Sequence, residues 1–315
     1  MTSDFWTRGM LFLSLTVVGV PGNGAVIFAF LLVAYHEGHL LPADAIVLHL
    51  ASANLMVVAV RCLLEVFATF EIYNVFDNTG CKAVIFIYRT SRSLSIWLTF
   101  VLSTYQCLSI TPPGSCWATA RALVAQYLGV IFLALWVINT SMSVAPLMFA
   151  VGASNNSKLI QNGINLEFCF LSFPSRLSRD ANGAAQVGRD VVPMTLMTTA
   201  SLIILVFLYR HSHQVKGIRG GRQGQSAERR AAITVVTLVM LYVLFYGVDN
   251  GLWVYTLTVP QTLGSSLISD LRIFFSSLYA AISPIIIIIS NKKVNKQLKF
   301  GKEQKMNSDA AQSSN

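Results

Sequence analysis

The sequence predicts an all-α membrane protein, a seven-transmembrane helix bundle with its N-terminus extracellular. Only 12% of its 315 residues are charged, about half the share found in soluble domains, and 54% are hydrophobic. Seven apolar stretches come close to the length of about 20 residues that a helix needs to cross the hydrocarbon core. The basic residues gather on one side of these stretches, which fixes the orientation of the bundle.

The predicted spans follow one another with polar connections and no internal repeat. They are residues 10–34, 45–70, 83–110, 122–145, 187–209, 232–254 and 267–289. The N-terminus has no basic segment and no small-residue cleavage site, so we expect no cleaved signal peptide. Gly38 and Pro42 mark the first turn between spans. The fifth span has the least regular start, because Arg189, Asp190 and Pro193 interrupt it. We expect one seven-span domain, residues 1–290, followed by a basic cytoplasmic tail, residues 291–315.

The basic residues predict which side faces the cytoplasm. Residues 210–230 hold six Lys and Arg, and residues 292–305 hold six more. Both segments lie on the side of the membrane opposite the N-terminus, and basic loops remain in the cytoplasm. The net charge of +9 is therefore directed at the membrane lipid of the inner leaflet and at a cytoplasmic partner, and not at a nucleic acid.

Two of the five cysteines fall on the predicted outer side. Cys81 opens the third span, and Cys169 lies in the long loop after the fourth. Disulfides persist only in oxidising compartments, so we expect a Cys81–Cys169 bridge, with two unrelated thiols as the alternative. Asn155 begins an Asn-Asn-Ser sequon in the same loop, and we expect it to be glycosylated.

Two arginines, Arg89 and Arg92, stand inside the third span. A charge at the centre of a bilayer costs at least ~2.5–3.5 kcal/mol, so each needs a structural or functional reason. They share one helix face, roughly 12 Å and roughly 16 Å below Cys81. Further charged or aromatic residues occupy the outer halves of other spans. These are Arg61, Glu65, Tyr246, Asp249, Asp270 and Arg272.

Two interpretations of these residues remain open. In the first, they only pair with one another and hold helices together: Arg61 with Glu65, and Arg89 or Arg92 with Asp249 or Asp270. In the second, they line an outward-open cavity that binds a ligand, which is the usual meaning of charges inside a membrane. At least one arginine stays free after pairing, and the guanidinium fork suits an anion. We expect at least one of Arg89 and Arg92 to contact an anionic or acceptor-rich ligand, and we favour Arg92 because it lies deeper.

The chain carries no motif of an enzymatic site. It contains no Gly-rich phosphate loop, no HExxH motif and no nucleophile elbow. The five histidines lack the spacing of metal ligands, so we expect no metal site and no cofactor. A secondary transporter of a small anion is the alternative function, although transporters usually carry repeated halves.

Several spans carry motifs of a known family. The first span contains Gly22-Asn23, which resembles the asparagine of rhodopsin-like receptors. The stretch "YRTSRSLSIWLTFVLSTYQCLSITP", residues 88–112, closely resembles the third span of vomeronasal type 1 receptors. The stretches "ERRAAITVVTLVMLYVLFYGVD" and "ISPIIIIIS" resemble their sixth and seventh spans. The rhodopsin-like signatures are replaced elsewhere, because Asn54 stands for the usual Asp and Tyr105-Gln106-Cys107 for the Asp-Arg-Tyr triplet.

The resemblance, which is closest to the class A-related olfactory receptors of fish, implies a function. It implies a rhodopsin-like, G-protein-coupled receptor that detects a small pheromone or odorant at the plasma membrane of chemosensory neurons. It also implies a heterotrimeric G protein of the inhibitory type as partner. We expect the basic inner segment to contact this G protein through Arg210, Lys216, Arg219, Arg229 and Arg230.

Overall fold

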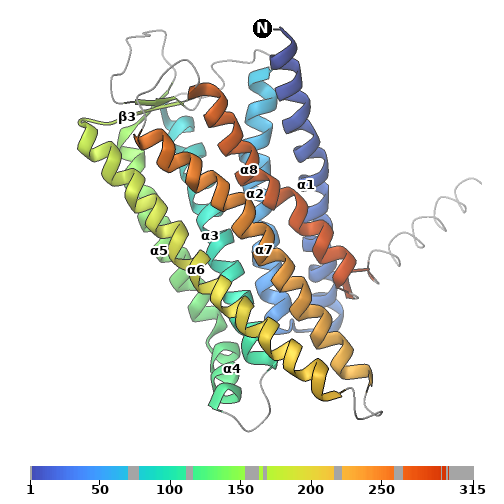
Figure 1. Cartoon of the computed structure of the whole chain (residues 1–315). Helices are drawn as coiled ribbons and strands as arrows, with labels where there is room; N and C mark the ends of the chain where they lie inside the picture. Colours follow the sequence, from blue (N-terminus) through green and yellow to red (C-terminus); the bar gives the residue numbers. More distant parts are fainter. Residues whose placement is uncertain are drawn as a thin grey trace, which may run out of the picture.

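Long helices packed side by side make up the protein, as the computed structural model in Figure 1 shows. The structure describes residues 2–69, 78–110, 116–152, 163–165, 169–215, 222–258, 265–291, 293–295 and 297. Its elements are α1 (Thr2–Glu37), α2 (Pro42–Thr69), α3 (Asn78–Ile110), α4 (Cys116–Gln126), α5 (Leu128–Val144), η1 (Ala145–Phe149), β1 (Ala150–Gly152), β2 (Gly163–Asn165), β3 (Cys169–Ser172), α6 (Arg176–Val215), α7 (Arg222–Thr258) and α8 (Ser265–Ser290).

Seven helical segments of the described chain are long and apolar enough to cross a membrane, which confirms the predicted number of spans. They belong to α1, α2, α3, α5, α6, α7 and α8. The fourth span differs from its predicted bounds of 122–145. The helix is interrupted at Tyr127, and the crossing segment runs over Leu128–Phe149. The preceding residues form the separate short helix α4.

The interruption predicted at the start of the fifth span does not break the helix. Helix α6 runs without a gap from Arg176 to Val215 and contains Pro193. Arg189 and Asp190 are both buried inside the bundle, where they form ion pairs. In the sequence these charges interrupt an apolar stretch. The residue that compensates Asp190, Arg92, lies on another helix, so the sequence around Asp190 does not show it.

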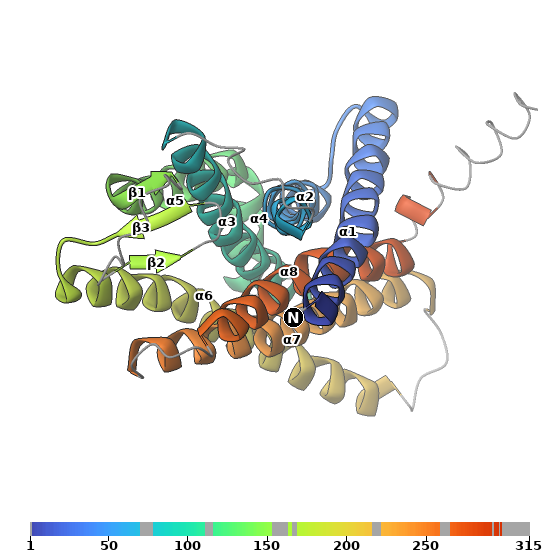
Figure 2. The same cartoon turned by 90° about the horizontal axis from the view of Figure 1, so that it is seen from above.

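Helix α3 lies at the centre of the bundle, in contact with α2, α5, α6 and α7 (Figure 2). Small polar side chains line much of its buried surface, which lets neighbouring helices approach closely and hydrogen-bond across the interface. Ser95 donates to the Asn54 side chain of α2 at 2.6 Å, and Asn54 donates to Ser283 of α8 at 2.9 Å. Ser93 donates to Asn139 of α5. Polar contacts therefore join the central helix to its neighbours.

Gly38 and Pro42 lie at the turn between α1 and α2, as predicted. Gly38 adopts φ +71°, a conformation that costs glycine little, and its N–H donates to the Ala34 carbonyl at 3.0 Å. Pro42 is the first residue of α2. An N–H at this position would have no acceptor within the helix, so proline loses no hydrogen bond there.

A small antiparallel sheet lies between α5 and α6 in the chain and was not predicted. Its strand order is β1-β3-β2, and Gly152 pairs with Cys169 in the register. Leu171 of β3 is buried with Ile85 of α3, so the sheet packs on the outer end of the central helix. The strands have only three or four residues each, too short for a clear alternating pattern in the sequence.

Candidate functional site: a charged cluster in the outer half of the bundle

Arg92 is the centre of a buried ionic network that joins three helices. Its guanidinium donates to Asp190 of α6 at 2.8 Å and lies 2.6 Å from a carboxylate oxygen of Asp249 on α7. It also lies 5.0 Å from the centroid of the Tyr246 ring, within the range of a cation–π contact. Arg92 is only 3% exposed, so these partners satisfy most of its charge inside the protein.

Two more arginines extend this network. Arg272 of α8 lies 3.2 Å from Asp249 and stacks over the Trp253 ring at 4.1 Å. Arg189 lies 3.4 Å from Asp190, its neighbour in α6. Each of the two aspartates therefore faces two guanidinium groups, and the network has one more positive than negative charge.

A second network connects α1, α2 and α8. Arg61 pairs with Glu65 at 2.8 Å, which confirms the pairing expected from their spacing. Arg8 of α1 also pairs with Glu65, and it lies 3.0 Å from Asp270. Of the two carboxylates expected to pair with an arginine of the third span, Asp249 does so, through Arg92, and Asp270 forms an ion pair with Arg8. Two arginines and two carboxylates balance here.

Arg89 differs from Arg92, although it lies only one turn away. No hydrogen bond or ion pair joins it to another residue within the described parts of the chain, and its Nε atom is buried without an acceptor. The side chain is partly buried. Its charged neighbours are Arg92, Arg189 and Asp190, of which Asp190 is already engaged by the other two.

We call these residues together the outer charged cluster. It comprises Arg8, Arg61, Glu65, Arg89, Arg92, Arg189, Asp190, Asp249, Asp270 and Arg272. Six guanidinium groups face four carboxylates, so the cluster carries surplus positive charge, concentrated around Arg89. Seven of the eight residues predicted to bind ligand belong to it, and Tyr246 lies against Arg92.

Sequence reasoning missed three members of the cluster, namely Arg8, Arg189 and Asp190. Arg8 precedes the first predicted span, residues 10–34. Arg189 and Asp190 stand out in the sequence only as an irregular start of the fifth span. The sequence did carry a signal for Asp190. Placing an acidic residue inside a span costs free energy, as placing an arginine there does, so it needs a partner for the same reason.

Aromatic side chains close the cluster on its inner side. The rings of Tyr242 and Tyr246 stack at 4.1 Å with an angle of 5° between their planes, and Tyr279 meets Tyr242 edge-on at 4.8 Å. The Tyr279 hydroxyl lies 3.1 Å from that of Thr99 on α3. All three tyrosines are fully buried, so Tyr246 contributes packing beneath Arg92 and exposes no surface.

The predicted disulfide and glycan are only partly within the described structure. Cys81 is disulfide-bonded, whereas Cys62 and Cys107 are free thiols. The side chain of Cys169 lies outside the described part, so its pairing with Cys81 stays a prediction. Asn155 also lies outside the described residues.

The inner face carries the basic residues predicted to meet a G protein. Arg210, Arg229 and Arg230 are exposed at the inner ends of α6 and α7, while Lys216 and Arg219 fall outside the described residues. Most of the predicted tail, residues 291–315, also lies outside them. In the described portion of the chain, no group of three or more His, Cys, Asp or Glu residues could hold a metal ion.

Comparison with known proteins adds an independent observation. The family model described as "Vomeronasal organ pheromone receptor family" matches residues 6–300. Olfactory receptor class A-like protein 1 of Danio rerio is 38% identical over 92% of this chain and 91% of its own length. Vomeronasal type-1 receptor 1 of Homo sapiens is 27% identical over 91% of this chain and 81% of its own.

A solved structure shares the fold. The crystal structure of squid rhodopsin superimposes with a TM-score of 0.72, covering 95% of this chain and 85% of that one at 16% sequence identity. At this identity the likeness concerns the fold alone, and it confirms the prediction of a rhodopsin-like seven-helix bundle.

Proposed function

Because this chain belongs to the vomeronasal organ pheromone receptor family, we propose that it detects a small anionic chemosignal at its outer charged cluster. Membership makes it a chemosensory, non-enzymatic G-protein-coupled receptor and decides against the transporter alternative. The identity of the ligand is the proposed part. The observation that carries it is Arg89, a cation for which the described residues offer no partner, beside a network that already holds surplus positive charge.

The charge balance favours an anion over a neutral or cationic ligand. A cationic ligand would meet more guanidinium groups than carboxylates, and like charges at short range repel strongly in a medium of low dielectric constant. A carboxylate or sulfonate would instead accept two parallel hydrogen bonds from the Arg89 fork. Arg89 is therefore the proposed contact in place of Arg92, because the Arg92 guanidinium is engaged by Asp190 and Asp249.

We further propose that the receptor acts at the plasma membrane of chemosensory neurons through an inhibitory-type G protein. The exposed Arg210, Arg229 and Arg230 support a cytoplasmic docking face for an acidic partner surface. Sensitivity of the response to pertussis toxin tests the inhibitory subtype. Guanine-nucleotide exchange by a G protein added to purified receptor tests coupling itself, and a transporter would be silent in this assay.

A calcium assay in cells that co-express a promiscuous G protein tests the ligand class. Carboxylic and sulfonic acids should be screened beside their neutral amides, with the same carbon skeleton in each pair. We expect acids to activate the receptor and their amides to be inactive. If only neutral compounds activate it, the anion proposal fails while the receptor function stands.

The role of Arg89 is tested by Arg89→Lys, which keeps the charge and removes the fork. We expect about a tenfold to hundredfold loss of potency for the active acid, with surface expression unchanged. Lys82→Gln is the matched control, since Lys82 is exposed near the outer end of the same helix. Equal potency of Arg89→Lys and the parent receptor would remove Arg89 from the site.

A further inference from the structure

The part of the outer charged cluster around Arg89 carries more positive charge than its carboxylates balance. Four guanidinium groups lie there, on α3, α6 and α8, and two carboxylates face them, one on α6 and one on α7. These residues are Arg89, Arg92, Arg189, Arg272, Asp190 and Asp249. Among the described residues, four positive charges therefore meet two negative ones inside the membrane-spanning bundle.

Both carboxylates are already engaged by guanidinium groups through both of their oxygens. Asp190 and Asp249 each face Arg92 through one oxygen, at 2.8 Å and 2.6 Å. Their other oxygens face Arg189 and Arg272, at 3.4 Å and 3.2 Å. Neither carboxylate thus has an oxygen without a guanidinium neighbour to offer to a further cation.

Arg89 is the cation that remains. Its Nε atom is buried and has no hydrogen-bond acceptor among the described residues, although Arg92 and Arg189 are among its charged neighbours. The side chain is half-buried on a helix that is long and apolar enough to cross a membrane. Like charges repel strongly where the dielectric constant is low, so a negative charge beside Arg89 would stabilise the folded receptor.

Water alone meets this need poorly. A water molecule can accept a hydrogen bond from Nε, but it brings no charge to offset the repulsion between the arginines. A guanidinium group is more weakly hydrated than an ammonium group, so it exchanges its water readily for a weakly hydrated anion. Chloride and the larger halides are such anions, and chloride is abundant outside cells.

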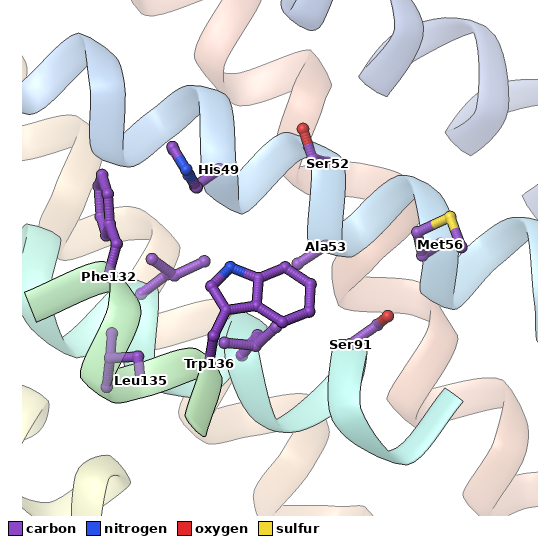
Figure 3. Close-up of a pocket in the computed structure, with 10 residues that line it drawn as sticks. His49, Ser52, Ala53, Met56, Ser91, Phe132, Leu135 and Trp136 are labelled. Atoms are coloured by element: carbon purple, nitrogen blue, oxygen red, sulfur yellow. The ribbon is translucent and has the colours of Figure 1, made fainter. Parts of the chain in front are cut away.

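The cavity between α2, α3 and α5 does not suit an anion (Figure 3). His49, Ser52 and Ser91 are among its lining residues, and no arginine or lysine lines it. Ser91 is two residues from Arg89, which places the two side chains about 160° apart around α3. Arg89 therefore lies on the opposite side of α3 from this cavity.

We propose that the receptor without chemosignal holds a chloride ion against the Arg89 guanidinium, on the side of α3 that faces α6. Arg89 donates to the ion through Nε, and the charge of Arg189 on α6 adds to the attraction. Asp190 repels the ion, but Arg92 and Arg189 offset that carboxylate. The ion acts as the counter-charge that the described residues do not supply.

The ion also competes with the proposed chemosignal. This step rests on the proposed function, because an anionic chemosignal would contact the same Arg89 fork. Binding of the acid displaces chloride, so the charge of Arg89 is compensated before and after the ligand binds. The apparent affinity for the acid then depends on the chloride concentration.

Thermal unfolding of the purified full-length receptor without chemosignal tests the ion site. The probe is chloride, at constant ionic strength, with potassium fluoride replacing potassium chloride because fluoride is strongly hydrated. We expect the melting temperature to rise with chloride and to level off as the site saturates. Bromide should act at lower concentration than chloride. Equal melting temperatures in chloride and fluoride at every concentration would overturn the proposal.

Variants locate the ion. Arg89→Gln keeps a hydrogen-bond donor and removes the charge, so its melting temperature should not distinguish chloride from fluoride. Lys82→Gln, which neutralises an exposed cation of the same helix, should respond like the parent receptor. A chloride effect that persists in Arg89→Gln would overturn the assignment to Arg89.

Glu167 is the acidic control, because it lies outside the described residues, two positions before β3. If its carboxylate compensated Arg89, chloride would stabilise Glu167→Gln and not the parent receptor. That result would overturn the proposal. We expect the parent and Glu167→Gln to respond to chloride alike.

Titration of an active acid separates this inference from the proposed function. The acid concentration that gives half of the maximal thermal stabilisation should rise about threefold to tenfold between about 5 mM and about 150 mM chloride. No dependence on chloride would overturn the displacement. If no acid activates the receptor while chloride stabilises it through Arg89, the proposed function fails and the ion site stands.

Discussion

Arg89 and Arg92 occupy the same face of α3 one turn apart, yet their environments assign them opposite roles. Arg92 is enclosed by carboxylates from α6 and α7, so removing either partner leaves a buried charge without compensation. Arg89 has no such partner within the described residues. At the residue scale, Arg92 should govern folding and Arg89 should govern the response to ligand.

Asp190→Asn tests the structural half of this statement. We expect it to lower the free energy of unfolding by about 3–5 kcal/mol, because Arg92 and Arg189 then share an uncharged partner. Thermal unfolding in detergent can be followed with a thiol-reactive dye, since Cys62 is free and fully buried in the native state. Asp180→Asn is the control on the same helix, because its carboxylate is exposed and its ion pairs are worth about 0–1 kcal/mol. Equal melting temperatures of the two variants would contradict the network's structural role.

Arg92→Lys provides the complementary measurement. A lysine keeps the charge but cannot reach Asp190 and Asp249 at once with the planar fork, so we expect less receptor at the cell surface. The potency of ligand at the receptors that do reach the surface should change less than in Arg89→Lys. Normal surface level with a large loss of potency would instead return the ligand contact to Arg92.

At the scale of single elements, Asn54 of α2 fixes the position of α2 relative to α3 and α8 through hydrogen bonds. Its amide donates to Ser283 of α8 and accepts from Ser95 of α3, and all three residues are fully buried. Asn54→Leu should lower the free energy of unfolding by about 1–3 kcal/mol, because it leaves two buried hydroxyls unpaired. Ser52→Ala, an exposed position on the same helix, should change the melting temperature little. A fully stable Asn54→Leu would show that water replaces the amide.

Lys293 ties the inner ends of α1 and α2 to the segment after α8. Its ammonium lies 3.2 Å from Asp44 and 3.4 Å from Glu37. Partial burial alone would lower the pKa of Lys293, but the two carboxylates outweigh this and raise it above the ordinary value of 10.5. Its stabilising effect is therefore complete below the unfolded pKa and is lost as pH rises through the higher folded pKa. We expect the melting temperature of the parent to exceed that of Lys293→Gln by a constant margin from pH 7 to about 10 and to converge above it. A margin that persists at higher pH would contradict this assignment.

The sequence predicted the helices and two of their ion pairs, Arg61–Glu65 and Arg92–Asp249, but not the pairs made by Arg8, Arg189 and Asp190. Span number follows from length and hydropathy, and the Arg61–Glu65 pair follows from i,i+4 spacing within one helix. The Arg92–Asp190 pair joins positions 98 residues apart, and nothing local specifies which helices meet. The same limit explains why the sequence left both Asp249 and Asp270 as partners for the arginines of the third span: Asp249 pairs with Arg92, and Asp270 pairs with Arg8.

At the scale of the whole molecule, charges separate into an enclosed outer cluster and an exposed inner face. Neutralising both Arg229 and Arg230 to Gln should reduce nucleotide exchange while leaving surface level and ligand affinity unchanged, because both are exposed at the inner end of α7. Radioligand binding and exchange on the same membranes measure the two quantities. Reduced surface expression with normal exchange per receptor would favour simple anchoring to anionic lipid.

The ionic network around Arg92 also has a mechanical consequence. It fixes α7 to α3 and α8 at Asp249, near the outer end of the helix, and 19 residues separate this point from Arg230. In a straight helix these 19 residues span about 28 Å, so a rotation of α7 about the ion pairs displaces its inner end. A tilt of α7 by about 10° about the ion pairs would move Arg230 by about 5 Å, roughly the rise of one helical turn. A small change in the angle of α7 at these ion pairs therefore becomes a displacement of several ångströms at the cytoplasmic surface.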